Sequence, residues 1–281
     1  MSEPQLLERI ILDDRVISFH RRWSSSAAYY HWHQCVELLY ISKGYGIVVV
    51  DNQHYTARPG RLFIFPPFRL HKVHVDESEK NQYHRTAMHI EQSAVESALH
   101  GFPRLQSQFA ALAASNVPAQ IFDLSERAEF MEVILAQFDA LEANGQTSAS
   151  EVAFLVMQIM AFLPARPQPF APTPQTAASR IMSWIEANYA GKFSLDELAR
   201  AMGLSRSYTS RVFRQQTGGS IHEYLLTRRI KRSCDLLRTT VDSVDEIALA
   251  VGFNEVTYFI TCFKKLMNQT PLRYRKASRQ R

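Results

Sequence analysis

Several features that define other protein classes are missing from this chain of 281 residues. No run of 18 or more apolar residues occurs, so no segment resembles a membrane-spanning helix. The N-terminus, MSEPQLLERIILDD, carries acidic residues early, where a secretory signal would have a basic start and an apolar core. We therefore expect a soluble, cytoplasmic protein with no membrane partner.

Cysteine is also scarce. Cys35, Cys234 and Cys262 are odd in number and widely spaced, and each falls inside an expected secondary-structure element. This pattern predicts neither a disulfide framework nor a cysteine-based zinc site. We expect three free thiols.

The first part of the chain carries no net positive charge, whereas the rest carries an excess of basic residues. Residues 1–174 hold 14 Lys/Arg against 18 Asp/Glu, a net charge of −4, whereas residues 175–281 hold 18 against 9, a net of +9. A polyanion is the partner that such a basic segment favours, although a solvated basic surface without a partner has the same composition.

Residues 16–90 alternate β-favouring runs with turn residues. Strands of four to seven residues at this spacing predict a sandwich or a small barrel, whose interior can hold one small ligand. The expected strands are VISFH, VELLYI, YGIVVV, HYTA, RLFIFP, LHKVHV and HRTAMHI.

Two amphipathic helices are expected next. Residues 125–143 place Phe130, Ile134, Phe138 and Leu141 on one stripe, and a capping box at Ser148 opens a second helix of the same period. These helices pack against the barrel or, in addition, form a two-fold dimer interface.

A proline-rich spacer follows, because LPARPQPFAPTPQTAAS disfavours both helix and central strand. It coincides with the change in charge, so the sequence divides into residues 1–163, a linker at 164–178, and residues 179–281. The fold class expected is α+β, with an N-terminal cupin-like β-barrel carrying helices and an all-α C-terminal domain.

The C-terminal part contains an internal repeat. SLDELARAMGLSRSYTSRVF, from Ser194, and SVDEIALAVGFNEVTYFITCF, from Ser243, align at a spacing of 49 that rises to 50 after one inserted residue. Each copy opens on a capping box and carries a glycine, Gly203 or Gly252, that can end a helix in a tight left-handed turn. A second helix then begins near Ser205 or Asn254. This is the pattern of a helix-turn-helix motif, in which the second helix enters the DNA major groove.

The hundred C-terminal residues resemble the AraC/XylS family of bacterial transcription regulators. The second copy carries the family signature in GFNEVTYFITCFKKLMNQTPLRYR, and residues 228–237 resemble the family's linking helix. The resemblance implies promoter binding and control of transcription, with contacts to RNA polymerase. Two positions depart from the pattern, since Thr261 stands where the family commonly has arginine and Asn268 where it commonly has glycine.

Roles carried over by position give a set of residues that contact double-stranded promoter DNA. Arg211 is best suited to a bidentate contact with guanine, and the loss of arginine at Thr261 indicates that the first unit reads more sequence than the second. The predicted DNA-binding residues are Arg206, Ser207, Ser210, Arg211, Arg214, Glu255, Val256, Thr257, Thr261, Lys264 and Lys265.

The N-terminal part resembles the two cupin motifs. His31, His33, Glu37 and Gly44 match the first, and Gly60, Pro66 and His71 match the second, in which Phe68 replaces a glycine. These imidazoles and carboxylate could converge on a metal, line a pocket without metal, or only support the fold.

We interpret the chain as a dimeric, non-enzymatic regulator that responds to a small-molecule effector such as a sugar, with no cofactor or metal assigned. The alternative is a metal-dependent cupin enzyme fused to a DNA-binding domain. The predicted effector-binding residues are His31, His33, Glu37, Tyr40, Tyr45 and His71.

Overall fold

The chain forms two compact units, Glu8–Thr173 and a C-terminal unit that begins at Pro174. Most of the predicted spacer at 164–178 lies outside the residues that the structure describes. Within the described part of the chain, none of the helices combines the length and apolar character that a membrane span requires. The computed structural model describes Ile10, Leu12 and residues 15–24, 30–50, 53–75, 82–114, 117–164 and 176–279.

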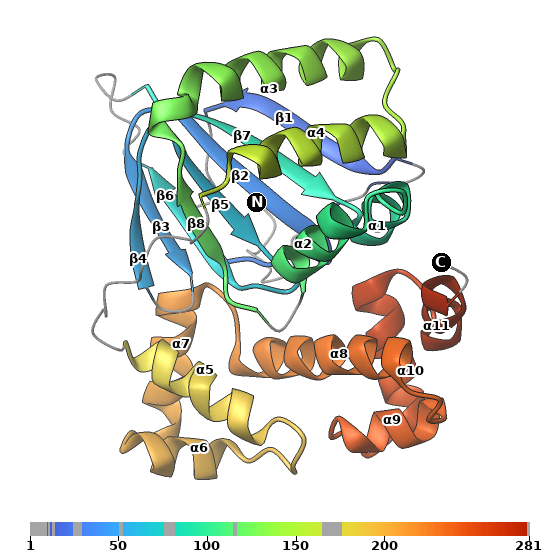
Figure 1. Ribbon diagram of the computed structural model, residues 1–281. Coiled ribbons are helices and arrows are strands. Elements are labelled where there is room, and N and C mark those ends of the chain that lie inside the picture. Colours follow the sequence, from blue (N-terminus) through green and yellow to red (C-terminus); the bar gives the residue numbers. More distant parts are fainter. Residues whose placement is uncertain are drawn as a thin grey trace. The chain divides into compact units, whose positions relative to one another are not determined.

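The N-terminal unit is built on antiparallel strands in two sheets (Figure 1). One has the order β1-β7-β2-β5-β8 and the other the order β4-β3-β6, so of the predicted sandwich or small barrel the described residues form a two-sheet arrangement. Seven strands lie where the sequence predicts them, and β8 was not predicted. The strands are β1 Ile17–Trp23, β2 Val36–Lys43, β3 Gly46–Val50, β4 Gln53–Ala57, β5 Arg61–Phe65, β6 His71–Val75, β7 His84–Ile90 and β8 Gln120–Asp123.

Successive side chains of the central strand β2 point to opposite sides of the sheet, and those of residues 36–41 are buried on both sides. Leu38 and Tyr40 belong to a core shared with the helices. Leu39 and Ile41 belong to a second core, between the two sheets, that includes Val48 and residues of β5 and β6. The strand therefore separates two apolar layers.

Helices cover the outer face of the larger sheet (Figure 1). The capping box at Ser148 is present, with Glu151 as its reciprocal partner. One predicted position is wrong: Phe130 is 62% exposed, because the buried stripe of its helix runs through Met131, Ile134, Leu135 and Phe138. The first two helices were not predicted. The four are α1 Gln92–Ala98, α2 Pro103–Ala113, α3 Ala128–Ala143 and α4 Ala149–Phe162.

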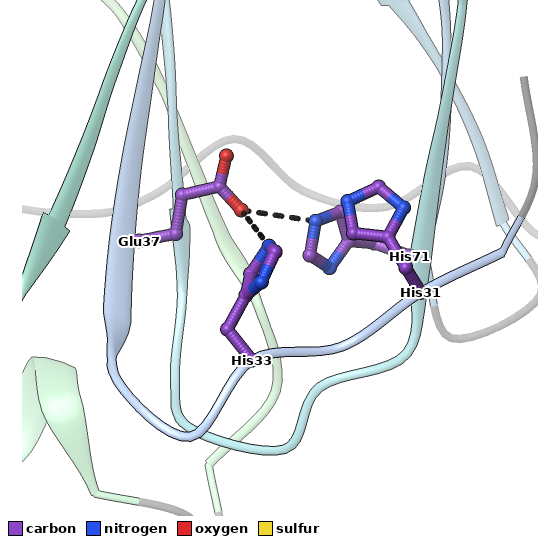
Figure 2. A group of neighbouring side chains, drawn as sticks. All are labelled: His31, His33, Glu37 and His71. Atoms are coloured by element: carbon purple, nitrogen blue, oxygen red, sulfur yellow. Dashed lines mark ion pairs between the residues drawn. The ribbon is translucent and has the colours of Figure 1, made fainter. Parts of the chain in front are cut away.

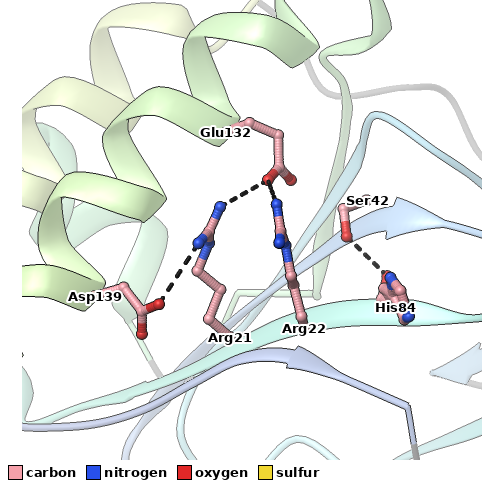
Figure 3. A network of polar contacts seen from close by, with 6 residues as sticks. All are labelled: Arg21, Arg22, Ser42, His84, Glu132 and Asp139. Carbon is pink, nitrogen blue, oxygen red and sulfur yellow. Dashed lines mark hydrogen bonds and ion pairs between the residues drawn. The ribbon is translucent and has the colours of Figure 1, made fainter. Parts of the chain in front are cut away.

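Ion pairs attach the edge strand β1 to α3 (Figure 3). Arg21 reaches Glu132 at 3.0 Å and Asp139 at 3.5 Å, and Arg22 reaches Glu132 at 3.7 Å. Arg22 has a left-handed backbone (φ 53°) at an irregularity in the β1–β7 pairing, which lets consecutive arginines turn toward the same helix.

The C-terminal unit is all helical in its described residues. Buried Leu198 and Ala199 in the first repeat correspond to buried Ile247 and Ala248 in the second, whereas Met202 is only half-buried. The long α8 joins the repeats. The helices are α5 Ala177–Asn188, α6 Leu195–Met202, α7 Arg206–Thr217, α8 Ile221–Thr239, α9 Val244–Ala250, α10 Val256–Met267 and α11 Pro271–Arg279.

The turns of the two repeats follow the predicted chemistry with one shift. Gly203 (φ 70°) caps α6, and Gly252 (φ 92°) follows α9. The hydroxyl of Ser205 caps α7, but α10 begins one residue later than predicted, with Glu255 as its N-cap in place of Asn254. Asn268 ends α10 in the left-handed conformation (φ 56°) that the departure from glycine required.

A buried arginine on α8 connects the segment before the first repeat to the turn of the second. The Arg229 side chain donates hydrogen bonds to the carbonyls of Tyr189 at 2.8 Å and Gly191 at 2.9 Å, after the end of α5. Its guanidinium also lies 5.6 Å from the ring centre of Phe253, in the turn between α9 and α10. Burial lowers the pKa of this guanidinium, because a charged group loses its contact with water there. The hydrogen bonds to the two carbonyls replace part of that lost hydration.

Candidate functional site

The solvent-facing side of α7 is mostly polar. Thr209, Val212 and Phe213 face inward and are buried, which leaves the opposite side of the helix to solvent. The guanidinium of Arg211 lies over the ring of Tyr208 at 5.4 Å, and Tyr208, which the sequence analysis missed, is 43% exposed. All five residues predicted to contact DNA from this helix are exposed: Arg206, Ser207, Ser210, Arg211 and Arg214.

The corresponding side of α10 is less basic at its start. The Thr261 hydroxyl donates to the Thr257 carbonyl one turn earlier, at 2.9 Å, so it is already engaged within the helix. Val256 is half-buried, unlike its neighbours. The remaining predicted contacts, Glu255, Thr257, Thr261, Lys264 and Lys265, are exposed.

A second polar site lies inside the N-terminal unit (Figure 2). His31, His33, Glu37 and His71 each offer one ligand atom, and these atoms all lie within 4.8 Å of one another. The Glu37 carboxylate is the centre of the group: its Oε2 is 3.1 Å from His33 Nε2 and 3.0 Å from His71 Nε2. All four side chains are buried.

Local backbone geometry brings the two histidine segments together. His31 and His71 exchange backbone hydrogen bonds of 2.9 Å in each direction, forming an isolated bridge. Before His71, Phe68 adopts φ 62° and its amide donates to the His33 carbonyl at 2.7 Å. The left-handed conformation explains why glycine fits this motif position and shows that phenylalanine preserves the turn.

A third strand contributes His89, a residue that the sequence analysis missed. It pairs directly with Glu37 across the β2–β7 ladder, and its Nε2 is 3.8 Å from Glu37 Oε1. Burial lowers the pKa of His89 to about 3 despite the nearby carboxylate, so the imidazole is neutral at physiological pH. Burial acts to raise the pKa of Glu37, but the charge of His71 and hydrogen bonds from His33 and His71 hold it well below its usual value.

Two predicted effector-binding residues do not join this cluster. Tyr40 is three residues from Glu37 on one strand and therefore points to the opposite face, into the core beneath the helices. Tyr45 lies in the turn between β2 and β3 and is 60% exposed. The structure thus assembles four of the six predicted residues and adds His89.

Two helix-turn-helix units in a basic helical unit, joined to a sheet unit that encloses a polar cluster, define a DNA-binding regulator with a separate ligand-binding domain. Residues 198–277 match the family model of a helix-turn-helix domain. Residues 16–160, more than half of the chain, match that of an AraC-like ligand binding domain. The chain belongs to the AraC family of transcription regulators, as its resemblance implied.

Individual relatives match either most of the chain or about a third of it. The HTH-type transcriptional activator RhaS of Klebsiella pneumoniae is 26% identical over 257 residues, which is 91% of this chain and 90% of that protein. YdeC of Bacillus subtilis, an HTH-type transcriptional regulator, is 37% identical over 97 residues, 34% of this chain and 33% of YdeC. The chain thus spans about a third of the length of YdeC.

Among solved structures, one similar chain is the C-terminal domain of the two-component response regulator yesN from Fusobacterium nucleatum. It is 41% identical, covers 34% of this chain and 93% of that domain, and has a TM-score of 0.33.

Proposed function

We propose that this regulator binds specific promoter DNA through α7 and α10 and changes transcription when its N-terminal unit binds a small molecule. The observation that carries the proposal is the pair of helix-turn-helix units with solvent-facing second helices in the part of the chain that has a net charge of +9. A positive face attracts the phosphate backbone, and the exposed side chains then meet base edges.

The two recognition helices have different roles in this proposal. Arg206, Arg211 and Arg214 equip α7 for base and phosphate contacts, with Ser207 and Ser210 beside them. In α10 the Thr261 hydroxyl is engaged with its own helix, so Lys264 and Lys265 contribute mainly by positioning the domain on phosphates.

Replacement of Arg211 by alanine tests the base-reading role. Loss of a bidentate guanine contact should weaken specific binding by about 1 to 3 kcal/mol and relax one base position. Binding sites selected from random DNA by the full-length variant and by the wild type give both readouts. Arg200→Ala is the matched control, because Arg200 is exposed on α6 outside the recognition helix and carries the same charge. An equal loss in both variants, with unchanged base preference, would contradict the assignment.

The N-terminal unit is the proposed effector-binding and dimerisation domain, at residues 1–163, with 164–178 as its linker to a DNA-binding domain at 179–281. The effector binds at the cluster around Glu37 rather than near Tyr40 or Tyr45, and polar donors there suit a small polar molecule such as a sugar. No residue is given a catalytic role. RNA polymerase is the expected partner on the promoter.

Dimerisation is proposed through the outer side of α3 and α4. Phe130, Val133 and Phe154 are 62%, 66% and 52% exposed there, which is unusual for large apolar side chains unless another surface covers them. Phe154→Ser should weaken a dimer by about 1 to 2 kcal/mol, measured by sedimentation equilibrium of the full chain. Gln108→Ser, at an exposed position of α2 outside this surface, is the control and should leave the equilibrium unchanged.

A further inference from the structure

A buried arginine on β7 lies on the side of the larger sheet that faces the smaller one. Arg85 pairs with Ile41 across the β2–β7 ladder, and paired residues share a face of the sheet. Ile41 and Ala87, the next residue of β7 on that face, belong to the core between the two sheets. Arg85 itself is only 6% exposed. It lies about 13 Å along the strand from His89 and therefore outside the cluster around Glu37.

No acidic side chain in the described part of the chain forms an ion pair with Arg85. Its buried Nε also has no hydrogen-bond partner among those residues. Burial removes most of the hydration that stabilises a cation in water. A guanidinium keeps its charge in proteins, so the loss of a proton does not relieve this cost. A buried arginine without an acidic partner therefore favours the binding of an anion.

The hydroxyl of Tyr83 is a second buried donor near Arg85. Tyr83 is 3% exposed and belongs to the core between the sheets, yet its hydroxyl has no hydrogen-bond partner among the described residues. Burial raises the pKa of Tyr83, and the positive charge of Arg85 only partly opposes this rise, so the hydroxyl keeps its proton at neutral pH. A guanidinium and a phenol both donate hydrogen bonds, and the oxygen atoms of an anion are the matching acceptors.

Aromatic side chains of the edge strand β1 lie beside the guanidinium. Trp23 pairs with Arg85 across the β1–β7 ladder, and its ring centre is 5.0 Å from the guanidinium carbon. Trp23 is 40% exposed, and the ring of exposed His20 lies 5.0 Å from its own. Arg85 therefore lies between the core and an exposed ring at the edge of the sheet, close to solvent. The tryptophan face also holds the guanidinium in place.

We propose that Arg85 and the Tyr83 hydroxyl bind an anionic group of the effector, a carboxylate or a phosphate, so that the effector is a small acid. The planar guanidinium donates two parallel hydrogen bonds to such a group, and the phenol donates a third. This assignment names the chemical class of the effector and so rests on the function proposed above. Because the Glu37 carboxylate repels a second anion, an effector that lies along β7 has its acidic group at Arg85 and its uncharged polar groups toward Glu37.

Ligand binding by the full-length protein tests the proposal. A panel of sugar acids, other hydroxy acids and sugar phosphates is compared with the uncharged sugar or amide that corresponds to each acid. Thermal midpoints and titration calorimetry give the readouts. We expect at least one acid to raise the midpoint at a concentration where its uncharged counterpart does not. Carboxylates and phosphate esters form separate arms, so the same measurement identifies the anionic group.

Variants of the two donors locate the binding site of that acid. Arg85→Met should weaken its binding by about a hundredfold or more, because the cation and its paired donors are lost. Tyr83→Phe should weaken it by about tenfold or more, the value of one hydrogen bond to a charged group. Arg104→Met is the matched control, since Arg104 is exposed on α2 and carries the same charge. It should bind the acid like the wild type.

Circular dichroism and affinity for a selected DNA site are measured for every variant. If Arg85→Met does not fold, Tyr83→Phe decides, because it removes only a hydroxyl that has no hydrogen-bond partner among the described residues. A panel in which no acid acts more strongly than its uncharged counterpart overturns the proposal, as does a folded donor variant that binds the acid like Arg104→Met. A neutral molecule that changes DNA affinity would leave the proposed function standing without the anion site, and acid binding without any change in DNA affinity would do the reverse.

Discussion

Replacing Gly252 by alanine should lower the free energy of unfolding by about 3 kcal/mol or more. An added Cβ would lie 2.8 Å from the carbonyl oxygens of both Tyr189 and Ala190 and 2.9 Å from Arg229 Nη2. Two of these three atoms belong to the backbone and cannot move aside. The residue also has φ 92°, a conformation that alanine adopts only with strain.

Gly203→Ala is the matched control for this variant. Gly203 has φ 70° at the equivalent turn of the first repeat, but no atom lies within 4 Å of its Cβ position. Its replacement should cost only the conformational strain, about 1 to 2 kcal/mol. Urea unfolding of the full chain, followed by circular dichroism, gives both values. Equal losses at the two glycines would show that the close approach at Gly252 has no energetic weight.

Arg229→Met should cost about 2 to 4 kcal/mol, because it leaves the carbonyls of Tyr189 and Gly191 without their donor in a largely buried place. Methionine keeps much of the apolar stem but not the guanidinium, so the loss reports the two hydrogen bonds together with the cation–π contact to Phe253. The variant should also bind DNA less specifically, since the contact joins the segment before the first repeat to the turn of the second. Urea unfolding and site selection measure these effects.

Arg232→Met is the control on the same helix. Arg232 is exposed, and its replacement should change stability by no more than about 0.5 kcal/mol. If Arg229→Met is equally mild, the contacts of Arg229 with Tyr189, Gly191 and Phe253 do not stabilise the unit.

Local signals predicted the helical unit well because its rules act over a few residues. Serine caps, a glycine turn and period-3.6 apolar positions placed both repeats, and Asn268 takes the left-handed conformation at the position where the family commonly has glycine. The error at Asn254 is a choice between adjacent caps, where Glu255 takes the N-cap position without a side-chain hydrogen bond. The role of Arg229 was not predictable, because its partners lie about 40 residues away along the chain.

The polar cluster was predicted only in part, for two different reasons. Strand parity alone could have excluded Tyr40, since positions 37 and 40 of one strand cannot share a face. The contribution of His89 depends on the pairing of β2 with β7, and nothing in the sequence specifies which strands become neighbours. The helices α1 and α2 were not predicted, although local signals for both are present: Glu91 caps the first and Pro103 opens the second.

The alternation along β2 has a consequence for how this protein could evolve. Glu37, Leu39 and Ile41 face the layer between the two sheets, whereas Leu38 and Tyr40 support the helical layer. In a duplicated gene, substitutions at the odd positions therefore alter the interior between the sheets while the helical layer stays intact. Selection on that interior and selection on the helical layer then proceed separately within one strand.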